Sequence, residues 1–387
     1  MLDFASSLYL GLRHPSAQTG GYDALTTGTP SSLAAAPLAR VVAAQAAALQ
    51  GCEAGMVAPS TLHLSIDVFE RLGRTHALVA DESLYPVLRW GLQRVMGIGV
   101  PVRWFQHGDP ADLARRIRQR RNELPPAIIV DATCAEGQPA PIARYLALAR
   151  RRGGLVAIDH SQVLGLLGHS PTTSHPWGIG GGGLLRYAGI GAAERVLLIA
   201  SWAKAFGAPL ATLCGPAAIV SEIARDGPTQ SHCSAASETS LRAALNAIAI
   251  NRRDGDARRA TLIERIARLE FGLRTLTRTR LPDLRVLRHG HPLQQIRLGS
   301  PERTKALHAG LRASGFRTAL LRQHEARYAL AVVVRASHSN TDIDALTHAI
   351  ASLARGLPRP AASAAACGNV ARPLPMEELE HVQDLGR

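Results

Sequence analysis

Lysine is rare in this sequence, and one of its lysines lies where chemistry is possible. Lysine and arginine together number 44, yet only Lys204 and Lys305 are lysines. Lys204 follows an apolar run and lies in the nearly uncharged segment Ser-Trp-Ala-Lys-Ala-Phe-Gly. Burial lowers the pKa of an amine, and a neutral amine can attack a carbonyl carbon. Lys204 is therefore a candidate for Schiff-base chemistry, although a lysine that extends from a loop into solvent fits the same pattern.

A second candidate is Asp159, which ends the apolar run Leu-Val-Ala-Ile. Ligands of open parallel sheets bind at the carboxyl ends of the strands. A buried aspartate there could face a pyridinium nitrogen and keep it protonated, so that the ring accepts electrons. An aspartate that only caps a helix or a turn is the ordinary alternative. Asp159 and Lys204, each at the end of a predicted strand, together favour a site over two separate structural roles.

These segments resemble motifs of the α-oxoamine synthases, in the branch that includes 8-amino-7-oxononanoate synthase and glycine C-acetyltransferase. Residues 158–168, Ile-Asp-His-Ser-Gln-Val-Leu-Gly-Leu-Leu-Gly, are similar to the family's Asp-Asp-Ala-His-Gly-x-Gly-x-x-Gly segment. Residues 201–207 are similar to its Thr-x-x-Lys-x-x-Gly segment, in which the lysine holds pyridoxal 5′-phosphate as an aldimine. Residues 8–12 and 336–344 resemble the family's first and last motifs. The likeness spans about residues 3–355 and implies a fold-type I pyridoxal-phosphate transferase of the aminotransferase class I/II superfamily.

The resemblance also implies roles for single residues. Lys204 and Asp159 would be catalytic and would bind the cofactor, and Arg322 would bind the carboxylate of the amino-acid substrate. No metal is implied. The remaining cofactor-binding positions are Ser60 and Thr61 (phosphate, at a helix N-terminus), Tyr85 (stacking on the ring), Cys134 and Gln162 (ring hydroxyl), Ser201 (phosphate) and Ser234 (phosphate, across a dimer interface). Taken alone, Ser60 and Thr61 could be an ordinary helix cap, and Arg322 could be a surface arginine.

Several positions depart from the family pattern. Gln162 stands where the family has a histidine, His160 replaces the second aspartate, and Tyr85 replaces a stacking histidine. The loop between Asp159 and Lys204 carries Gly178 and Gly180–Gly183, which we expect to form a mobile flap rather than a dinucleotide-binding turn. These departures affect the expected substrate and reaction more than the cofactor.

The elements that would position these residues alternate regularly from about residue 38 to 265. Short runs rich in Val, Ile and Leu alternate with longer helical patterns, which predicts an α/β fold with a mainly parallel central sheet and helices on both faces. The predicted strands are 55–58, 77–80, 100–105, 127–131, 155–159, 196–200 and 211–215, and the predicted helices are 38–49, 62–72, 86–96, 110–122 and 142–151.

A smaller α+β lobe is predicted after a long helix over 256–276. Its predicted strands are 284–287, 294–298, 318–321 and 329–334, and its predicted helices are 302–314 and 341–353. We expect four parts: an N-terminal segment 1–37 that packs on the small lobe, a large cofactor-binding domain 38–265, a small domain 266–357, and a poorly ordered tail 358–387.

Composition narrows the possible partners. No apolar run reaches the roughly 18–20 residues that a membrane helix needs, and the N-terminus lacks a secretory signal pattern. The five cysteines form no CxxC pair, which favours a reducing cytoplasm. The net charge of +14 comes without a nucleic-acid-binding motif, so we expect no nucleic-acid partner. A basic surface could instead attract a phosphate-rich acyl carrier.

Three functions follow from these observations. The first is decarboxylative condensation of an amino acid with an acyl thioester, carried by coenzyme A or an acyl carrier protein, through a Lys204 aldimine. The second is an aminotransferase or another α-carbon reaction with the same cofactor. The third is a non-catalytic binding or regulatory protein that keeps the fold. The fold type places its active site at a subunit interface, so we expect a homodimer.

Overall fold

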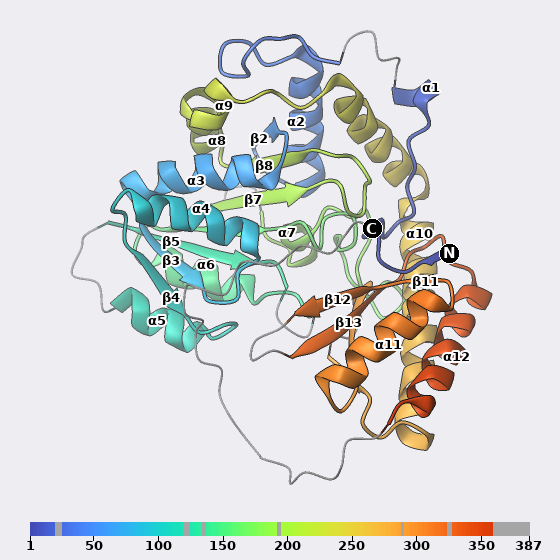
Figure 1. Ribbon diagram of the computed structural model, residues 1–387. Helices are drawn as coiled ribbons and strands as arrows, with labels where there is room; N and C mark the ends of the chain where they lie inside the picture. The colour runs from blue at the N-terminus through green and yellow to red at the C-terminus, as the bar shows by residue number, and fades with distance from the viewer. Residues whose placement is uncertain are drawn as a thin grey trace.

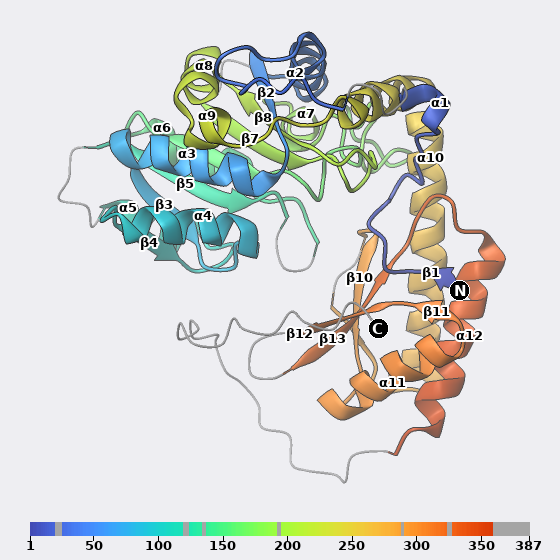
Figure 2. The same ribbon diagram turned by 45° about the horizontal axis from the view of Figure 1, so that its top comes forward.

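The chain folds into two lobes joined by a long helix. A computed structural model describes residues 1–19, 25–118, 124–133, 137–191, 195–287, 290–322 and 327–358. The larger lobe is built on a seven-stranded sheet and the smaller lobe on a four-stranded sheet (Figure 1). Helix α10 (Glu238–Thr279) begins on the large lobe and continues along the small one (Figure 2). Cys134 and most of the predicted tail lie outside the described residues.

The large sheet has the strand order β2-β8-β7-β6-β5-β3-β4. Its strands are β2 (Ala54–Ala58), β3 (Ala77–Asp81), β4 (Val102–Phe105), β5 (Pro126–Asp131), β6 (Leu155–Asp159), β7 (Val196–Ser201) and β8 (Ala211–Gly215). Strands β4, β3, β5, β6 and β7 pair in parallel, whereas β8 runs antiparallel to both of its neighbours. The carboxyl ends of the five parallel strands therefore meet at one edge, as the alternation of elements predicts.

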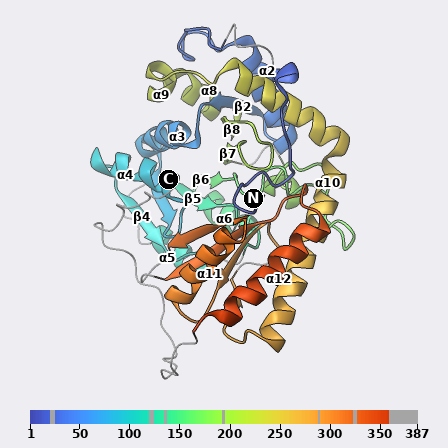
Figure 3. The same cartoon turned by 45° about the vertical axis from the view of Figure 1, so that its right-hand side comes forward.

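Both faces of this sheet are buried, which explains the continuous apolar runs. Ile128 and Val130 of β5 contribute to one apolar cluster, and Ala127 and Ile129 to the other. One face is covered by α3 (Thr61–Thr75), α4 (Pro86–Gly97), α8 (Ala217–Asp226) and α9 (Pro228–His232). The other face is covered by α2 (Pro37–Gln50), α5 (Pro110–Arg118), α6 (Ile142–Arg150) and α7 (Leu184–Tyr187), with α10 against α2 (Figure 3).

Helix α10 is much longer than the sequence predicts, since it begins at Glu238 and not near residue 256. The Asp-Gly-Asp run at 254–256 reads as a helix breaker, but Gly255 is helical because it leaves room for two buried neighbours. A Cβ at Gly255 would lie 2.4 Å from Oδ1 of Asn251 and 2.9 Å from Nη2 of Arg259. Within the described part of the chain, no helix is both long and apolar enough to span a bilayer.

The small lobe holds an antiparallel sheet in the order β12-β13-β10-β9. Its strands are β9 (Arg285–Val286), β10 (Leu293–Arg297), β12 (Ala319–Arg322) and β13 (Tyr328–Val333). Helices α11 (Pro301–Ala313) and α12 (Asn340–Gly356) pack with it, and α12 also packs on α10 (Figures 1 and 2). This arrangement matches the order of elements expected from the sequence.

The N-terminal segment contacts both lobes. Strand β1 (Leu2–Asp3) pairs in parallel with β11 (Phe316–Arg317) of the small lobe, and the Ala336 N–H donates to the carbonyl of Tyr9. Short helix α1 (Ser16–Thr19) then lies against α10. Further on, Leu25 and Ser32 bond to the start of α10 and to α9, both in the large lobe. The segment thus crosses from one lobe to the other.

Hydrogen bonds join the glycine-rich loop to neighbouring elements, and the mobility predicted for it stays a prediction. The N–H groups of Gly165 and Gly168 donate to carbonyls of Gly181 and Trp177, and that of Gly183 donates to Leu167. Helix α10 holds the other side of the loop through three side chains. Asn251 bonds the carbonyl of Gly180, Asp256 accepts its N–H, and the buried Arg259 bonds the carbonyl of Gly165. The glycines serve close packing.

Gly183 shows why no side chain fits in this loop. Its φ is +88°, and a Cβ there would lie 1.9 Å from Cε1 of His160. His160 is fully buried between α2 and α7, where its Nε2 accepts the N–H of Leu184 and its Nδ1 faces Oε1 of Gln50. Burial lowers the pKa of His160 to about 3, so the ring is neutral.

We predict that Gly183→Ala lowers the free energy of unfolding by about 2 kcal/mol or more, because strain at positive φ adds to overpacking against His160. Gly189→Ala is the matched control, since Gly189 has φ +65° and open space around its Cβ position. It should cost only about 1 kcal/mol from backbone strain. Urea unfolding of both variants measures the difference, and equal losses would contradict the packing argument.

Candidate active site

Three aspartates end neighbouring strands at the carboxyl edge of the large sheet. Asp159 ends β6, Asp131 ends β5 and Asp81 ends β3. Asp131 and Asp159 are directly in register on adjacent parallel strands, so their side chains leave the sheet on the same side. Oδ1 of Asp159 accepts the N–H of Ser161 at 2.9 Å, and the Asp159 side chain is almost fully buried. The sheet thus concentrates negative charge at one edge.

Asp131 differs from the other two aspartates in its hydrogen bonding. Its Oδ2 accepts the backbone N–H of Tyr85 at 3.1 Å, while its Oδ1 is buried without a hydrogen-bond partner among the described residues. Burial raises the pKa of Asp131 well above its usual range, and the nearby charges of Asp159 and Asp81 raise it further. Asp131 is therefore harder to ionise than an ordinary aspartate, because its neighbours are also carboxyl groups.

Asp81 is neutralised in another way. Its carboxylate accepts the N–H of Ser83 and of Gly108, and both of its oxygens face Nδ1 of His107 at 2.9 and 3.1 Å. The hydrogen bond to Asp81 raises the pKa of His107, although partial burial opposes the rise. In the described part of the chain, no group of three or more His, Cys, Asp or Glu side chains is placed to hold a metal ion.

Lys204 and Asp159 meet at Tyr85. Tyr85 precedes helix α4, and the Nζ of Lys204 lies 5.4 Å from the centroid of its ring. Burial raises the pKa of the Tyr85 hydroxyl, and the charges of Asp159 and Asp131 add to the rise. The Lys204 amine thus lies over the Tyr85 ring, the Tyr85 N–H bonds Asp131, and the charge of Asp159 acts on the Tyr85 hydroxyl. Half of the Tyr85 surface stays exposed, which leaves the ring open to a ligand.

Hydrogen bonds hold the Lys204 loop to the end of β6. The N–H of Ser201 donates to Oγ of Ser161 at 2.9 Å, and the N–H of Ala203 donates to Oγ of Ser201. Trp202 is buried against Phe206, and its indole N–H donates to Thr212. These bonds fix where the chain turns just before Lys204.

Helix α3 presents an uncapped N-terminus. Ser60 occupies the N-cap position but makes no capping bond, because its Oγ is turned to Nδ1 of His63 at 2.8 Å. The first turn of α3 contains no acidic residue. The first N–H groups of a helix lack partners within it and carry partial positive charge. An anion could therefore bind at the N-terminus of α3, beside the hydroxyls of Ser60 and Thr61.

The structure does not test three of the predicted site residues. Arg322 is exposed at the end of β12 in the small lobe, paired across the sheet with Tyr328, and the four residues after it lie outside the described ranges. Ser234 is exposed in the turn between α9 and α10. Cys134 lies outside the described residues. Their roles stay predictions from the resemblance.

The sequence analysis missed Asp131 and Asp81, although the reasoning that selected Asp159 applies to both. Each ends an apolar strand predicted to lie in the same sheet. His14 was also missed, and here no local pattern gives a signal. Its Nε2 lies 2.8 Å from the carbonyl of Phe206, and the amide of Asn246 in α10 bonds its Nδ1. The ring therefore ties the Lys204 loop to the N-terminal segment.

Comparison with known proteins agrees with the motifs. The 8-amino-7-oxononanoate synthase of Halorhodospira halophila is 29% identical over 320 residues, which cover 81% of this chain and 74% of that protein. The enzyme of the same name from Pseudomonas aeruginosa (strain PAO1) is 26% identical over 302 residues, which cover 76% of this chain and 70% of that protein. No protein-family model matches the chain.

Solved structures show the same fold. The serine palmitoyltransferase of Sphingomonas wittichii has a TM-score of 0.78 at 16% identity and covers 91% of this chain and 87% of its own. The 8-amino-7-oxononanoate synthase of Francisella tularensis has a TM-score of 0.68 at 14% identity and covers 91% and 97%. The predicted fold class is confirmed, and so is the resemblance to the α-oxoamine synthases in sequence and in fold.

We predict that Asp131→Asn raises the free energy of unfolding relative to the parent, and that this gain grows with pH. The raised pKa means that ionising Asp131 is harder in the folded chain, so the parent loses stability as pH rises above about 4, the ordinary aspartate pKa, toward the folded value. Asn cannot ionise and avoids that loss.

Denaturant unfolding between pH 4 and 8 measures the effect. Asp226→Asn is the control, because Asp226 is exposed and its bond to Arg225 lowers its pKa, so it should show no such gain. Parallel pH curves for Asp131→Asn and the parent would contradict a raised pKa of Asp131.

Proposed function

We propose that this protein is a pyridoxal-phosphate-dependent transferase that condenses an amino acid with an acyl thioester and releases carbon dioxide. The observation that carries the proposal is geometric: Ser161 bonds both Asp159 and Ser201, three residues before Lys204, and the Lys204 amine lies over the Tyr85 ring. The curated relatives named 8-amino-7-oxononanoate synthase and the fold of serine palmitoyltransferase support it.

The residues of the site suit this cofactor. An uncapped helix N-terminus with Ser60 and Thr61 suits the phosphate, and Ser201 lies on the loop that carries the lysine. Lys204 would hold the aldehyde carbon, and Asp159 would hold a proton on the ring nitrogen. Tyr85 offers an exposed aromatic face for stacking. A structure of a serine palmitoyltransferase from S. paucimobilis carries bound PLP on the same fold, at a TM-score of 0.75.

When bound, the cofactor supplies an electron sink for the electron pair that is freed at the amino acid's α-carbon. The chain's own residues prepare that event. Asp159 would face the ring nitrogen from the end of β6, next to Asp131, whose pKa is raised by burial and by the charges of Asp159 and Asp81. Lys204 would hold the α-proton of the substrate and return it. Arg322 would bind the substrate carboxylate with a bidentate guanidinium.

We also propose a phosphate-rich acyl carrier as substrate, a homodimeric assembly and a cytoplasmic location. The positive net charge of +14 would attract a phosphate-rich carrier such as coenzyme A or an acyl carrier protein. A homodimer would bring Ser234 of one subunit toward the site of its partner. The thiols of Cys52, Cys214 and Cys233 are unpaired, which fits a cytoplasmic location.

We predict that the purified protein gains a visible absorbance band on addition of pyridoxal phosphate, and that Lys204→Ala abolishes it, because the amine that binds the aldehyde carbon is gone. Lys305→Ala is the matched control. Lys305, the second lysine, stacks on Tyr328 of the small lobe, with its Nζ 4.2 Å from the ring centroid. Borohydride reduction followed by peptide mass spectrometry should place the label on residue 204, and a label on residue 305 would contradict the assignment.

We predict that thiol release and carbon dioxide release occur in equal amounts, and only when an amino acid and an acyl thioester are both present. A panel of amino acids, each tested with and without acyl-coenzyme A or acyl carrier protein, measures both products, with Lys204→Ala as the blank. An aminotransferase would instead convert the amino acid to a 2-oxo acid with no thioester present. That outcome would overturn the proposed condensation while leaving the cofactor assignment intact.

A further inference from the structure

A buried polar cluster joins Gln162 to both segments that flank the site. The hydroxyl of Tyr9, in the N-terminal segment, donates to Oε1 of Gln162 at 2.5 Å. Nε2 of His291, in the small lobe just before β10, lies 3.2 Å from the backbone carbonyl of Gln162. Tyr9 and His291 also contact each other edge to face, with ring centroids 5.7 Å apart. Three regions far apart in the sequence therefore converge on one glutamine.

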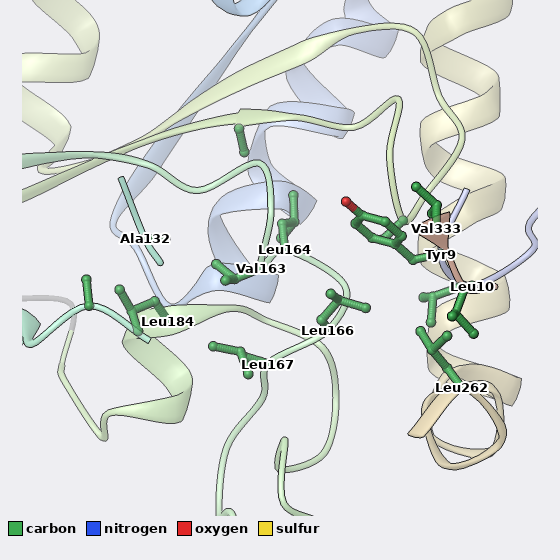
Figure 4. Packing of buried hydrophobic residues seen from close by; sticks show 14 of the residues in the cluster. Tyr9, Leu10, Ala132, Val163, Leu164, Leu166, Leu167, Leu184, Leu262 and Val333 are labelled. Carbon is green, nitrogen blue, oxygen red and sulfur yellow. The ribbon is translucent and has the colours of Figure 1, made fainter. Parts of the chain in front are cut away.

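The two aromatic residues are well fixed. Tyr9 and His291 are 1% and 4% exposed, so their polar atoms depend on protein partners. Nδ1 of His291 accepts the N–H of Leu293 at 3.0 Å, which leaves the proton on Nε2, where it can be donated to Gln162. Figure 4 shows the Tyr9 hydroxyl extending from the N-terminal segment toward the loop that carries Val163 and Leu164.

This geometry orients the amide of Gln162. Because Tyr9 donates to Oε1, the NH2 group is the part of the amide left for a ligand. Within the described residues, no hydrogen bond engages Nε2 of Gln162. Gln162 directly follows Ser161, which bonds both Asp159 and Ser201, so its backbone is close to the end of β6 and to the start of the Lys204 loop. The NH2 group of an amide donates hydrogen bonds at every physiological pH. A neutral imidazole can present either a donor or an acceptor nitrogen to the ligand, and its charge changes with pH.

We propose that Tyr9 and His291 position Gln162 so that its amide NH2 donates to the oxygen on the cofactor ring, and that this links the seating of the ring to the N-terminal segment and the small lobe. The inference rests on the proposed function for the identity of the ligand. Tyr9 and His291 act as positioning residues, because they touch Gln162 and reach the ligand only through it.

A double-mutant cycle tests the coupling between Tyr9 and Gln162. Tyr9→Phe, Gln162→Ala and the double variant are titrated with pyridoxal phosphate, and the dissociation constant and the position and pH dependence of the absorbance band are recorded. Losing one oriented hydrogen bond should weaken binding roughly 3- to 10-fold and shift the band. Tyr9→Phe should have that effect with Gln162 present and none in the Gln162→Ala background.

Two further variants sharpen the test. Gln162→Glu keeps an oxygen for Tyr9 but replaces the NH2, so it should bind pyridoxal phosphate more weakly than Gln162→Ala. Tyr145→Phe is the control for loss of a buried hydroxyl, since Tyr145 is equally buried but lies in α6 against Phe105, and it should bind as the parent does. Wild-type binding by Gln162→Glu, or equal effects of Tyr9→Phe in both backgrounds, would overturn the inference.

Unfolding of the cofactor-free variants gives a second readout. The Tyr9–Gln162 coupling should appear as non-additive changes in the free energy of unfolding even without pyridoxal phosphate, and additive changes would overturn the positioning role. If the parent fails to bind pyridoxal phosphate, the proposed function fails and this inference fails with it. If the parent binds it through Lys204 while Tyr9→Phe changes nothing, only this inference fails.

Discussion

The crowding of carboxyl groups at one edge of a parallel sheet is the constraint on which the site depends. Parallel strands deliver their carboxyl ends together, and here Asp81, Asp131 and Asp159 end three of them. Three anions this close would repel one another strongly in a partly buried setting. The structure resolves the conflict differently at each position. Asp81 pairs with His107, the pKa of Asp131 is raised by burial and by its neighbours, and Asp159 accepts the N–H of Ser161.

The same constraint explains why the lysine loop is held so firmly. An amine compensates the remaining negative charge only if it stays near it, and Lys204 is on a loop that could otherwise move. Ser161 and Ser201 bond the loop to the end of β6, while His14 bonds the carbonyl of Phe206 from the N-terminal segment. The glycine-rich loop also packs closely, since Gly183 lies directly against the buried His160.

Local patterns predict most of the large sheet, because strands buried on both faces leave apolar runs in the sequence. Strands β6 and β8 begin and end where the sequence predicts. The first part of α10, from Glu238, was not predicted, and only the packing of Asn251 and Arg259 shows why a glycine lies at position 255 within the helix. Asp131 could have been predicted by the strand-end argument that selected Asp159. The contact between Tyr9 and Gln162 joins residues that are 153 positions apart, and no periodic pattern in the sequence indicates a contact of this kind.

The departures from the family pattern make physical sense together. Aspartate at position 160 would add a fourth carboxyl group beside an edge that already holds three, whereas His160 is neutral and directs its nitrogens away to Gln50 and Leu184. Glutamine at position 162 likewise offers a hydrogen-bond donor without a titratable charge. Both replacements therefore add no charge beside the aspartates, so the repulsion between the carboxyl groups at this edge is not increased.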